Sequence, residues 1–237
     1  MKLSYEYETG IIEFGVVFRN RKTMAIQIEP PDKITVLSPK GVKEDEILKS
    51  VKGKSKWIVK KLFQLAEMES LKKTRKIING ESFIYMGMDY PLQIVVEGRY
   101  KKVQVELFRD ILYVYTDIND KEKIRLALKK WYKEKSLEKV RERVIYFQKY
   151  FDLELNKVMV KEQKRQWGSC TSQRNLYFNW KIIMAPSPVL DYLVVHEMCH
   201  MVHMNHSTDF WNLVKSILPD YEERRELLRN QGVKYDL

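Results

Sequence analysis

All four histidines of this 237-residue chain lie in one window of 11 residues, at His196, His200, His203 and His206. Random placement rarely gathers every copy of a residue type into so short a segment, so the cluster calls for a chemical explanation. Imidazole is the commonest side-chain ligand for metal ions in proteins. The cluster therefore predicts a metal site.

Two of these histidines belong to the pattern H-E-x-x-H, which runs from His196 to His200. The mostly apolar residues 190–195 come before it and indicate that the pattern lies on a helix. Residues four apart on an α-helix are separated by about 6 Å along the axis and about 40° around it. Two imidazoles so placed can bind one ion, and zinc, which favours nitrogen ligands, is the ion that we expect.

A catalytic zinc site keeps one of its four positions open, so it needs three protein ligands. His206 follows His200 by six residues, a spacing seen where the helix stops and the chain turns back toward the metal. His203 would lie about 10.5 Å along a continued helix from His196, too far to share one tetrahedral ion. We predict one zinc ion per chain, held by His196, His200 and His206, with His203 facing substrate or solvent.

Glu197 is the predicted catalytic residue. On a helix its side chain is rotated by about 60 to 100° from the two neighbouring histidines. Its carboxylate can then take a proton from a water molecule at the open position, which is the task of a general base. Cys199 is better explained as a small packed residue than as a soft metal ligand.

The rest of the chain must supply the elements that position these residues. Up to residue 118 the sequence predicts strands, with two helices between residues 43 and 70. We expect three antiparallel strands at residues 11–18, 23–28 and 33–37. An amphipathic helix is predicted over residues 121–151, with a break near Ser136, and short strands are predicted at 157–160, 163–169 and 175–183. The fold class is therefore α+β, with a β-rich module over residues 1–118 and a second domain over residues 119–237.

The composition narrows the class of protein. No apolar run approaches the roughly 18 residues of a membrane-spanning helix, and the first eight residues carry acids where a secretory signal would be apolar. We expect a cytoplasmic protein without a membrane partner. Its two cysteines, Cys170 and Cys199, are then free thiols.

The net charge of +11 is unevenly placed, because residues 152–237 hold 11 basic and 11 acidic side chains and the whole excess lies in residues 1–151. A solvated basic face explains such an excess most simply. The alternative is contact with a nucleotide or a nucleic acid. Two further functions therefore stay open: a zinc-dependent, pyrophosphatase-like hydrolase of nucleotide phosphoanhydrides, and a DNA-associated protein with an auxiliary metal site.

Several motifs together resemble the YgjP-like metallopeptidase family, which is related to SprT-like and minimal zincin proteases. They are Gln166 to Cys170, Asn179-Trp180, Ala185-Pro186, His196 to His200, Asn205-His206-Ser207, Phe210-Trp211 and Pro219-Asp220-Tyr221. The metzincins match only in part, because they have glycine at the position of His203 and a methionine turn downstream, whereas no methionine follows His206 here.

The resemblance implies a zincin-like mixed α/β metallopeptidase domain over residues 119–237, with a small sheet above the H-E-x-x-H helix. It implies a zinc cofactor and a peptide or protein substrate, which an edge strand receives by β-addition. The segment of Trp167, Gly168 and Ser169 is expected near the cleft. Weaker candidates for substrate contact or oxyanion stabilisation are Arg165, Asn179, His203 and Tyr221.

Overall fold

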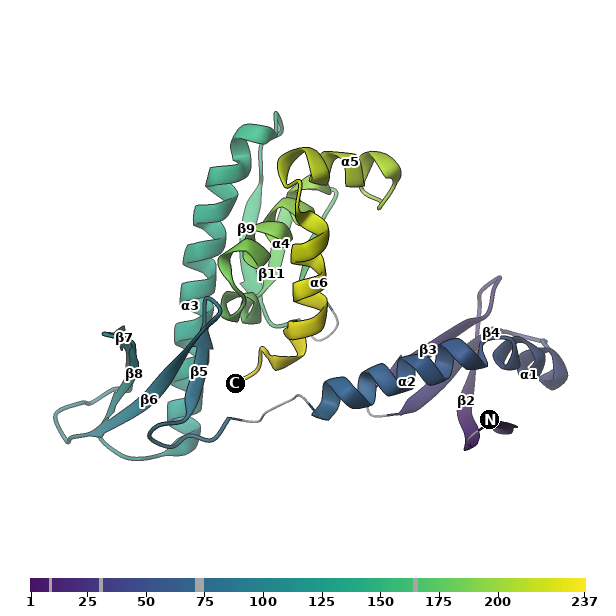
Figure 1. The fold of residues 1–237 in the computed structure, drawn as a ribbon, viewed down its shortest axis with the longest axis horizontal. Helices are drawn as coiled ribbons and strands as arrows, with labels where there is room; N and C mark the ends of the chain where they lie inside the picture. The colour runs from purple at the N-terminus through teal and green to yellow at the C-terminus, as the bar shows by residue number, and fades with distance from the viewer. Residues whose placement is uncertain (9, 30–31, 71–74, 164–165) are drawn as a thin grey trace. The chain divides into compact units, whose positions relative to one another are not determined.

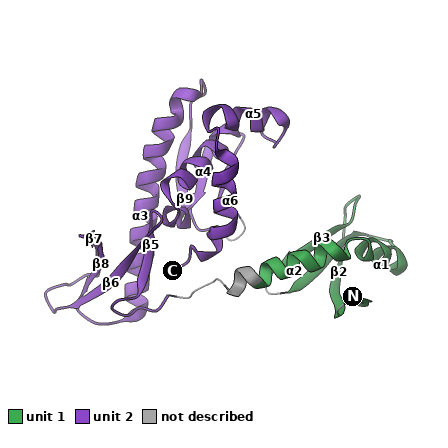
Figure 2. Ribbon diagram, in the orientation of Figure 1, with its two compact units in different colours: residues 1–72 green, residues 73–237 purple. Residues whose placement is uncertain are grey.

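The computed structural model describes residues 1–8, 10–29, 32–70, 75–163 and 166–237 (Figure 1). The chain divides into two compact units, residues 1–72 and residues 73–237 (Figure 2). Both units combine strands with helices, which confirms the predicted α+β class. The histidine cluster belongs to the second unit.

The first unit is a four-stranded sheet with two helices. Its elements are β1 (Lys2–Tyr7), β2 (Gly10–Arg19), β3 (Ala25–Glu29), β4 (Lys33–Pro39), α1 (Glu44–Lys52) and α2 (Ser55–Ser70), and the strand order is β1-β2-β4-β3. The prediction of three antiparallel strands was wrong in one pairing, since β2 and β4 are parallel. After β2 the chain enters the hairpin of β3 and β4, and the second strand of that hairpin lies next to β2.

The second unit opens with another four-stranded sheet, followed by a long helix. The strands are β5 (Ser82–Tyr85), β6 (Met88–Val96), β7 (Gln104–Phe108) and β8 (Ile111–Thr116), in the order β5-β6-β8-β7. The helix α3 (Lys121–Phe147) is capped by Asp120, whose side chain accepts hydrogen bonds from the backbone N–H groups of Glu122 and Lys123. The expected break near Ser136 is absent, because Ser136 is fully buried within a continuous helix.

A three-stranded sheet and three further α-helices complete this unit. They are β9 (Lys157–Lys161), β10 (Gly168–Cys170), β11 (Asn175–Asn179), α4 (Ser187–Cys199), α5 (Thr208–Ile217) and α6 (Tyr221–Gln231), with 3₁₀ turns η1 (Gln148–Tyr150), η2 (Trp180–Met184) and η3 (Gly232–Lys234). The sheet order is β10-β11-β9, so β10 is an edge strand. The strand predicted over 175–183 ends at Asn179, whose side chain accepts a hydrogen bond from the N–H of Lys181 and starts η2 instead.

One hydrophobic core joins the strands β5 to β8 to the helices and strands that follow. Leu112 of β8, Leu128 of α3 and Val194 of α4 are all fully or almost fully buried in it. The predicted boundary between residues 118 and 119 therefore falls inside the second unit, and the division into a module of residues 1–118 and a domain of residues 119–237 stays a prediction. None of the helices in the described residues combines the length and apolar character that crossing a membrane requires.

The turn between β5 and β6 fixes the segment that leads into α4. The N–H groups of Met86 and Gly87 donate to the carbonyls of Ile183 and Met184, at 2.8 and 3.0 Å. Gly87 has a φ of +80°, and a Cβ there would come within 3.1 Å of three atoms of Pro186. A glycine is therefore needed where this turn packs on the start of the helix that carries H-E-x-x-H.

An ion pair between α3 and α4 generates the first prediction. The guanidinium of Arg143 donates to both carboxylate oxygens of Asp191, at 2.5 and 3.1 Å, and both side chains are largely buried. Asp191→Asn leaves the guanidinium without its anionic partner, so we expect the free energy of unfolding to fall by about 1–3 kcal/mol. Urea denaturation measures it. Glu142→Gln, which breaks an exposed pair with Lys139, should cost about 0.5 kcal/mol or less, and equal losses in both variants would contradict the prediction.

The two cysteines generate a second prediction. Both are free thiols, with Cys170 half-buried and Cys199 buried. Burial raises the pKa of Cys170, with help from the nearby Glu197 carboxyl, to about 11, and burial raises the pKa of Cys199 to about 12. At pH 7 a thiol-specific disulfide reagent should react slowly with the folded protein and find two thiols after denaturation without reductant. Finding none after denaturation would mean a disulfide.

Candidate metal centre

The helix α4 is mostly buried, and its candidate functional residues lie at its C-terminal end. It follows Pro186 and carries Pro188 in its first turn, where a missing N–H costs nothing. Its apolar residues are 0 to 5% exposed, and it contacts α3, α5 and α6. The position of its last turn is therefore fixed by packing on several sides.

The chain turns sharply after α4 and brings His206 back toward the helix. The helix ends at Cys199, with His200 as its C-cap. The side-chain oxygen of Asn205 accepts a hydrogen bond from the N–H of Ser207, and the Ser207 hydroxyl accepts one from the N–H of Phe210 at the start of α5. His206 is thus placed between a turn residue and a helix cap.

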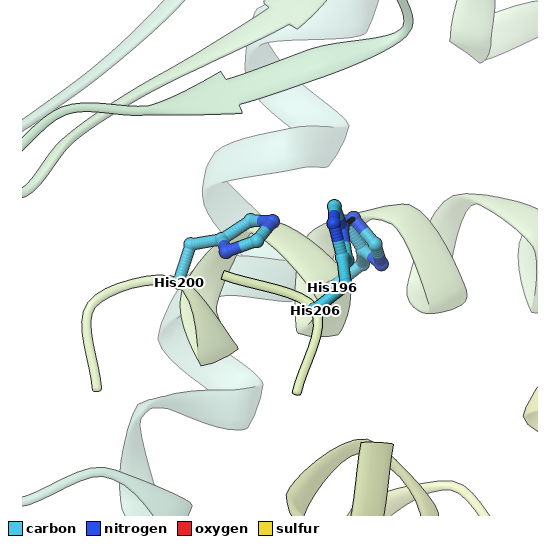
Figure 3. A group of neighbouring side chains, drawn as sticks. All are labelled: His196, His200 and His206. Atoms are coloured by element: carbon cyan, nitrogen blue, oxygen red, sulfur yellow. Dashed lines mark hydrogen bonds between the residues drawn. The ribbon is translucent and has the colours of Figure 1, made fainter. Parts of the chain in front are cut away.

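Three imidazoles meet at this point (Figure 3). One nitrogen from each of His196, His200 and His206 lies within 4.8 Å of the others. The Nε2 atoms of His196 and His206 are 3.1 Å apart, and two nitrogens bound to one tetrahedral zinc ion lie about 3.3 Å apart. The donor set and its spacing therefore fit a zinc ion, and His203 is not part of the group.

His203 contributes to the cluster through its backbone. Its carbonyl oxygen lies 2.9 Å from Nδ1 of His200. A carbonyl only accepts hydrogen bonds, so Nδ1 of His200 carries a proton and Nε2 is the nitrogen left for a metal. The ring of His200 also stacks on Phe210, with centroids 4.5 Å apart, which fixes its plane.

The charge state of the other two imidazoles suits metal binding as well. Burial lowers the pKa of His196 to about 3, and the neighbouring His200 and His206 add to the effect. Burial and His200 also lower the pKa of His206. Neutral imidazoles have the free lone pair that metal coordination needs.

Glu197 lies against the edge strand β10. Its side chain is 4% exposed, and among the described residues nothing donates a hydrogen bond to its Oε2 atom. Burial raises the pKa of its carboxyl to about 8. A Cβ on Gly168 would lie 2.5 Å from Oε1 of Glu197, so only glycine leaves room for the carboxyl beneath the strand. The structure thus brings together Gly168 and Glu197; the family resemblance implied only that Gly168 lies near the cleft.

Trp167 and Asn179, two further predicted site residues, make structural contacts in this region. Trp167 packs edge-on against Tyr235, with ring centroids 6.0 Å apart. Both amide atoms of Asn179 bind backbone groups, because Nδ2 donates to the carbonyl of Gln163 and Oδ1 accepts from the N–H of Lys181. Arg165 lies outside the described residues.

Ser169 and Tyr221 lie on different elements, β10 and α6. Ser169 is half-buried in β10 opposite Tyr177 of β11. Tyr221 donates its hydroxyl hydrogen to a carboxylate oxygen of Glu222 and stacks its ring on Trp211, with centroids 5.4 Å apart. Trp211 in turn stacks on His206, at 5.5 Å.

Sequence reasoning missed Arg225, which also lies at this aromatic group. Its guanidinium carbon is 4.7 Å from the ring centroid of Trp211. The signal was present in the sequence, because Arg225 follows Tyr221 by one helical turn and must share its face. Tyr192 is a similar case, one turn before His196, and its hydroxyl lies 3.5 Å from Nδ1 of that histidine.

Among the solved structures that this chain resembles are two archaeal metallopeptidase zymogens. Abylysin of Pyrococcus abyssi is 14% identical, covers 40% of this chain and 96% of its own, and has a TM-score of 0.37. Jannalysin of Methanocaldococcus jannaschii is 17% identical, covers 39% and 96%, and has a TM-score of 0.35. No curated protein matches by sequence.

The family model described as "YgjP-like, metallopeptidase domain" matches residues 22–231, which is most of the chain and includes all three converging histidines. The chain therefore belongs to the YgjP-like metallopeptidase family.

Proposed function

We propose that this protein is a zinc-dependent peptidase in which His196, His200 and His206 hold one zinc ion and Glu197 is the general base. One observation carries the proposal. Three imidazole nitrogens converge within 4.8 Å of one another, and the residue next to His196 is a buried carboxyl with an unpaired oxygen. Membership of a metallopeptidase family supports the same reaction class.

The choice of zinc follows from the donor set. Three imidazole ligands leave one tetrahedral position open, which is typical of catalytic and not of structural zinc sites. When bound, zinc supplies Lewis-acid chemistry, polarising the scissile carbonyl and making a water molecule more acidic.

Glu197 moves the proton in this proposal. Its Oε2 atom has no donor among the described residues, so it is free to accept a hydrogen bond from the attacking water. The carboxyl then takes that proton and returns it to the leaving amine, first as base and then as acid. A pKa raised by burial to about 8 suits proton transfer in both directions near neutral pH.

The edge strand β10 offers a place for the peptide. It pairs with β11 on one side only, and its Gly168 backbone lies on the Glu197 carboxyl. An extended peptide that added a strand at this edge would pass close to both Glu197 and the histidines. Trp167, Gly168 and Ser169 are the proposed substrate contacts at this edge, while Arg165, His203, Asn179 and Tyr221 stay weaker candidates.

The two alternatives remain predictions to be tested beside peptides. A basic region at residues 1–151 could attract a nucleotide or a nucleic acid. A substrate screen should therefore include a nucleoside triphosphate, and DNA binding should be measured against salt concentration, since phosphate contacts make affinity fall steeply with salt.

A third prediction tests the ligand assignment. His206→Ala removes a converging nitrogen, so zinc content should fall well below one ion per chain. His203→Ala is the matched control, because it keeps the backbone carbonyl that orients His200, and its zinc content should stay near one. Atomic absorption on dialysed protein measures both. Equal losses in the two variants would contradict the assignment.

A fourth prediction separates metal binding from chemistry at Glu197. Glu197→Gln keeps the size of the side chain and removes its proton acceptor, so activity on a cleaved peptide should fall by about 10²- to 10⁴-fold. Zinc content and melting temperature should change little. The exposed Glu142→Gln variant is the control and should retain activity. Wild-type turnover by zinc-loaded Glu197→Gln would exclude the general-base role.

A further inference from the structure

The helix α6 carries three arginines, and two of them are paired with acids. Arg224 contacts Asp220 at 2.9 Å, and Arg229 contacts Glu226 at 3.6 Å. Within the part of the chain that the structure describes, no carboxylate lies within ion-pair distance of Arg225, whose side chain is exposed. Arg225 is therefore a solvent-facing cation without an anionic partner on its own helix.

This cation is held beside the candidate metal centre. The guanidinium of Arg225 lies over Trp211, 4.7 Å from the ring centroid. The same indole stacks on His206, with centroids 5.5 Å apart and planes inclined by 22°. A single ring thus separates the positive charge from one of the converging histidines.

The position of Arg225 is fixed by the helix that carries it. Tyr221, one turn earlier, is buried and stacks on the same indole, and Leu228 is buried in the core of the second unit.

The guanidinium of Arg225 is suited to bind a carboxylate. The indole covers part of it, and its planar set of N–H donors matches the two oxygens of a carboxylate. Cation–π contact with an indole holds the group in place without neutralising it. The site can thus bind an anion that arrives from solution next to the three histidines.

We propose that Arg225 is a specificity-determining residue that binds a carboxylate of the substrate peptide, an inference that rests on the proposed peptidase function. An extended peptide advances about 3.3 Å per residue, so the carboxylate would lie within roughly three residues of the scissile bond. It can come from an Asp or Glu side chain or from the C-terminus of the peptide.

Equilibrium binding of three dye-labelled, alanine-rich hexapeptides tests the proposal. The first carries one Glu and an amidated C-terminus, the second has Gln in place of Glu, and the third is the Gln peptide with a free C-terminal carboxylate. Fluorescence anisotropy is measured with zinc-loaded and with metal-free protein, because a bound metal can itself attract a carboxylate. The variants are Arg225→Gln, Arg225→Lys and the control Arg229→Gln.

We expect the wild type and Arg229→Gln to bind at least one carboxylate peptide about 2- to 5-fold more tightly than the uncharged peptide, in both metal states, as is typical of an ion pair at an exposed side chain. Arg225→Gln should lose this preference, and Arg225→Lys should keep part of it. A preference for the Glu peptide assigns a side-chain carboxylate, and a preference for the free C-terminus assigns a terminal one. Melting temperatures of the variants should match the wild type, since Arg225 is exposed.

Three results would overturn the proposal: no measurable binding of either carboxylate peptide, equal affinity of the wild type for all three peptides, or a preference that survives in Arg225→Gln.

Cleavage of the same peptides tests the peptidase function separately. An Arg225-dependent preference without any cleavage would refute the peptidase and leave the carboxylate site. A loss of turnover in Arg225→Gln that is equal for all peptides, with unchanged binding, would place Arg225 at the reacting carbonyl and refute the carboxylate site.

Discussion

The close packing of a strand backbone on a buried carboxyl is the constraint on which the site depends. A Cβ on Gly168 of β10 would lie 2.5 to 2.7 Å from three side-chain atoms of Glu197, so the backbone of the strand packs directly on the carboxyl of α4. This contact sets the separation between the edge strand and the helix. Because His196 is the residue before Glu197 and His200 caps the same helix, the helix that packs on the edge strand also carries two of the three converging histidines.

A second close contact fixes the strand in turn. A Cβ on Gly232 would lie 2.7 Å from the ring of Trp167, and Tyr235 packs edge-on against the same ring. The residues after α6 therefore hold Trp167, which immediately precedes Gly168. Through these contacts the C-terminal segment, far from the histidines in sequence, helps to position the backbone that covers Glu197. Close packing of this kind transmits small displacements.

The sequence identified the local part of the site better than the part made by distant residues. The spacing of His196, His200 and His206 needs only one helix and one turn, and the structure brings their nitrogens together. The parallel pairing of β2 with β4 could not be read from the alternation of apolar residues, because alternation sets which face is buried and not which strand is the neighbour. The spacing of Arg225 from Tyr221 could be read from the sequence, but its contact with Trp211, which comes from another helix, could not.

Stability alone does not explain the residues at the end of α4. Leaving a buried polar atom without a hydrogen-bond partner costs about 1–3 kcal/mol, and Oε2 of Glu197 is such an atom among the described residues. The neighbouring buried residues Val195 and Met198 show that an apolar side chain can be accommodated in this helix. Packing does not explain why a carboxyl is kept at this cost beside three converging imidazoles. The proposed reaction explains it better, because a water molecule and a substrate would supply the missing hydrogen-bond partners. The same burial that destabilises the carboxyl shifts its pKa toward neutrality, so the energetic cost and the proposed reactivity have one physical origin.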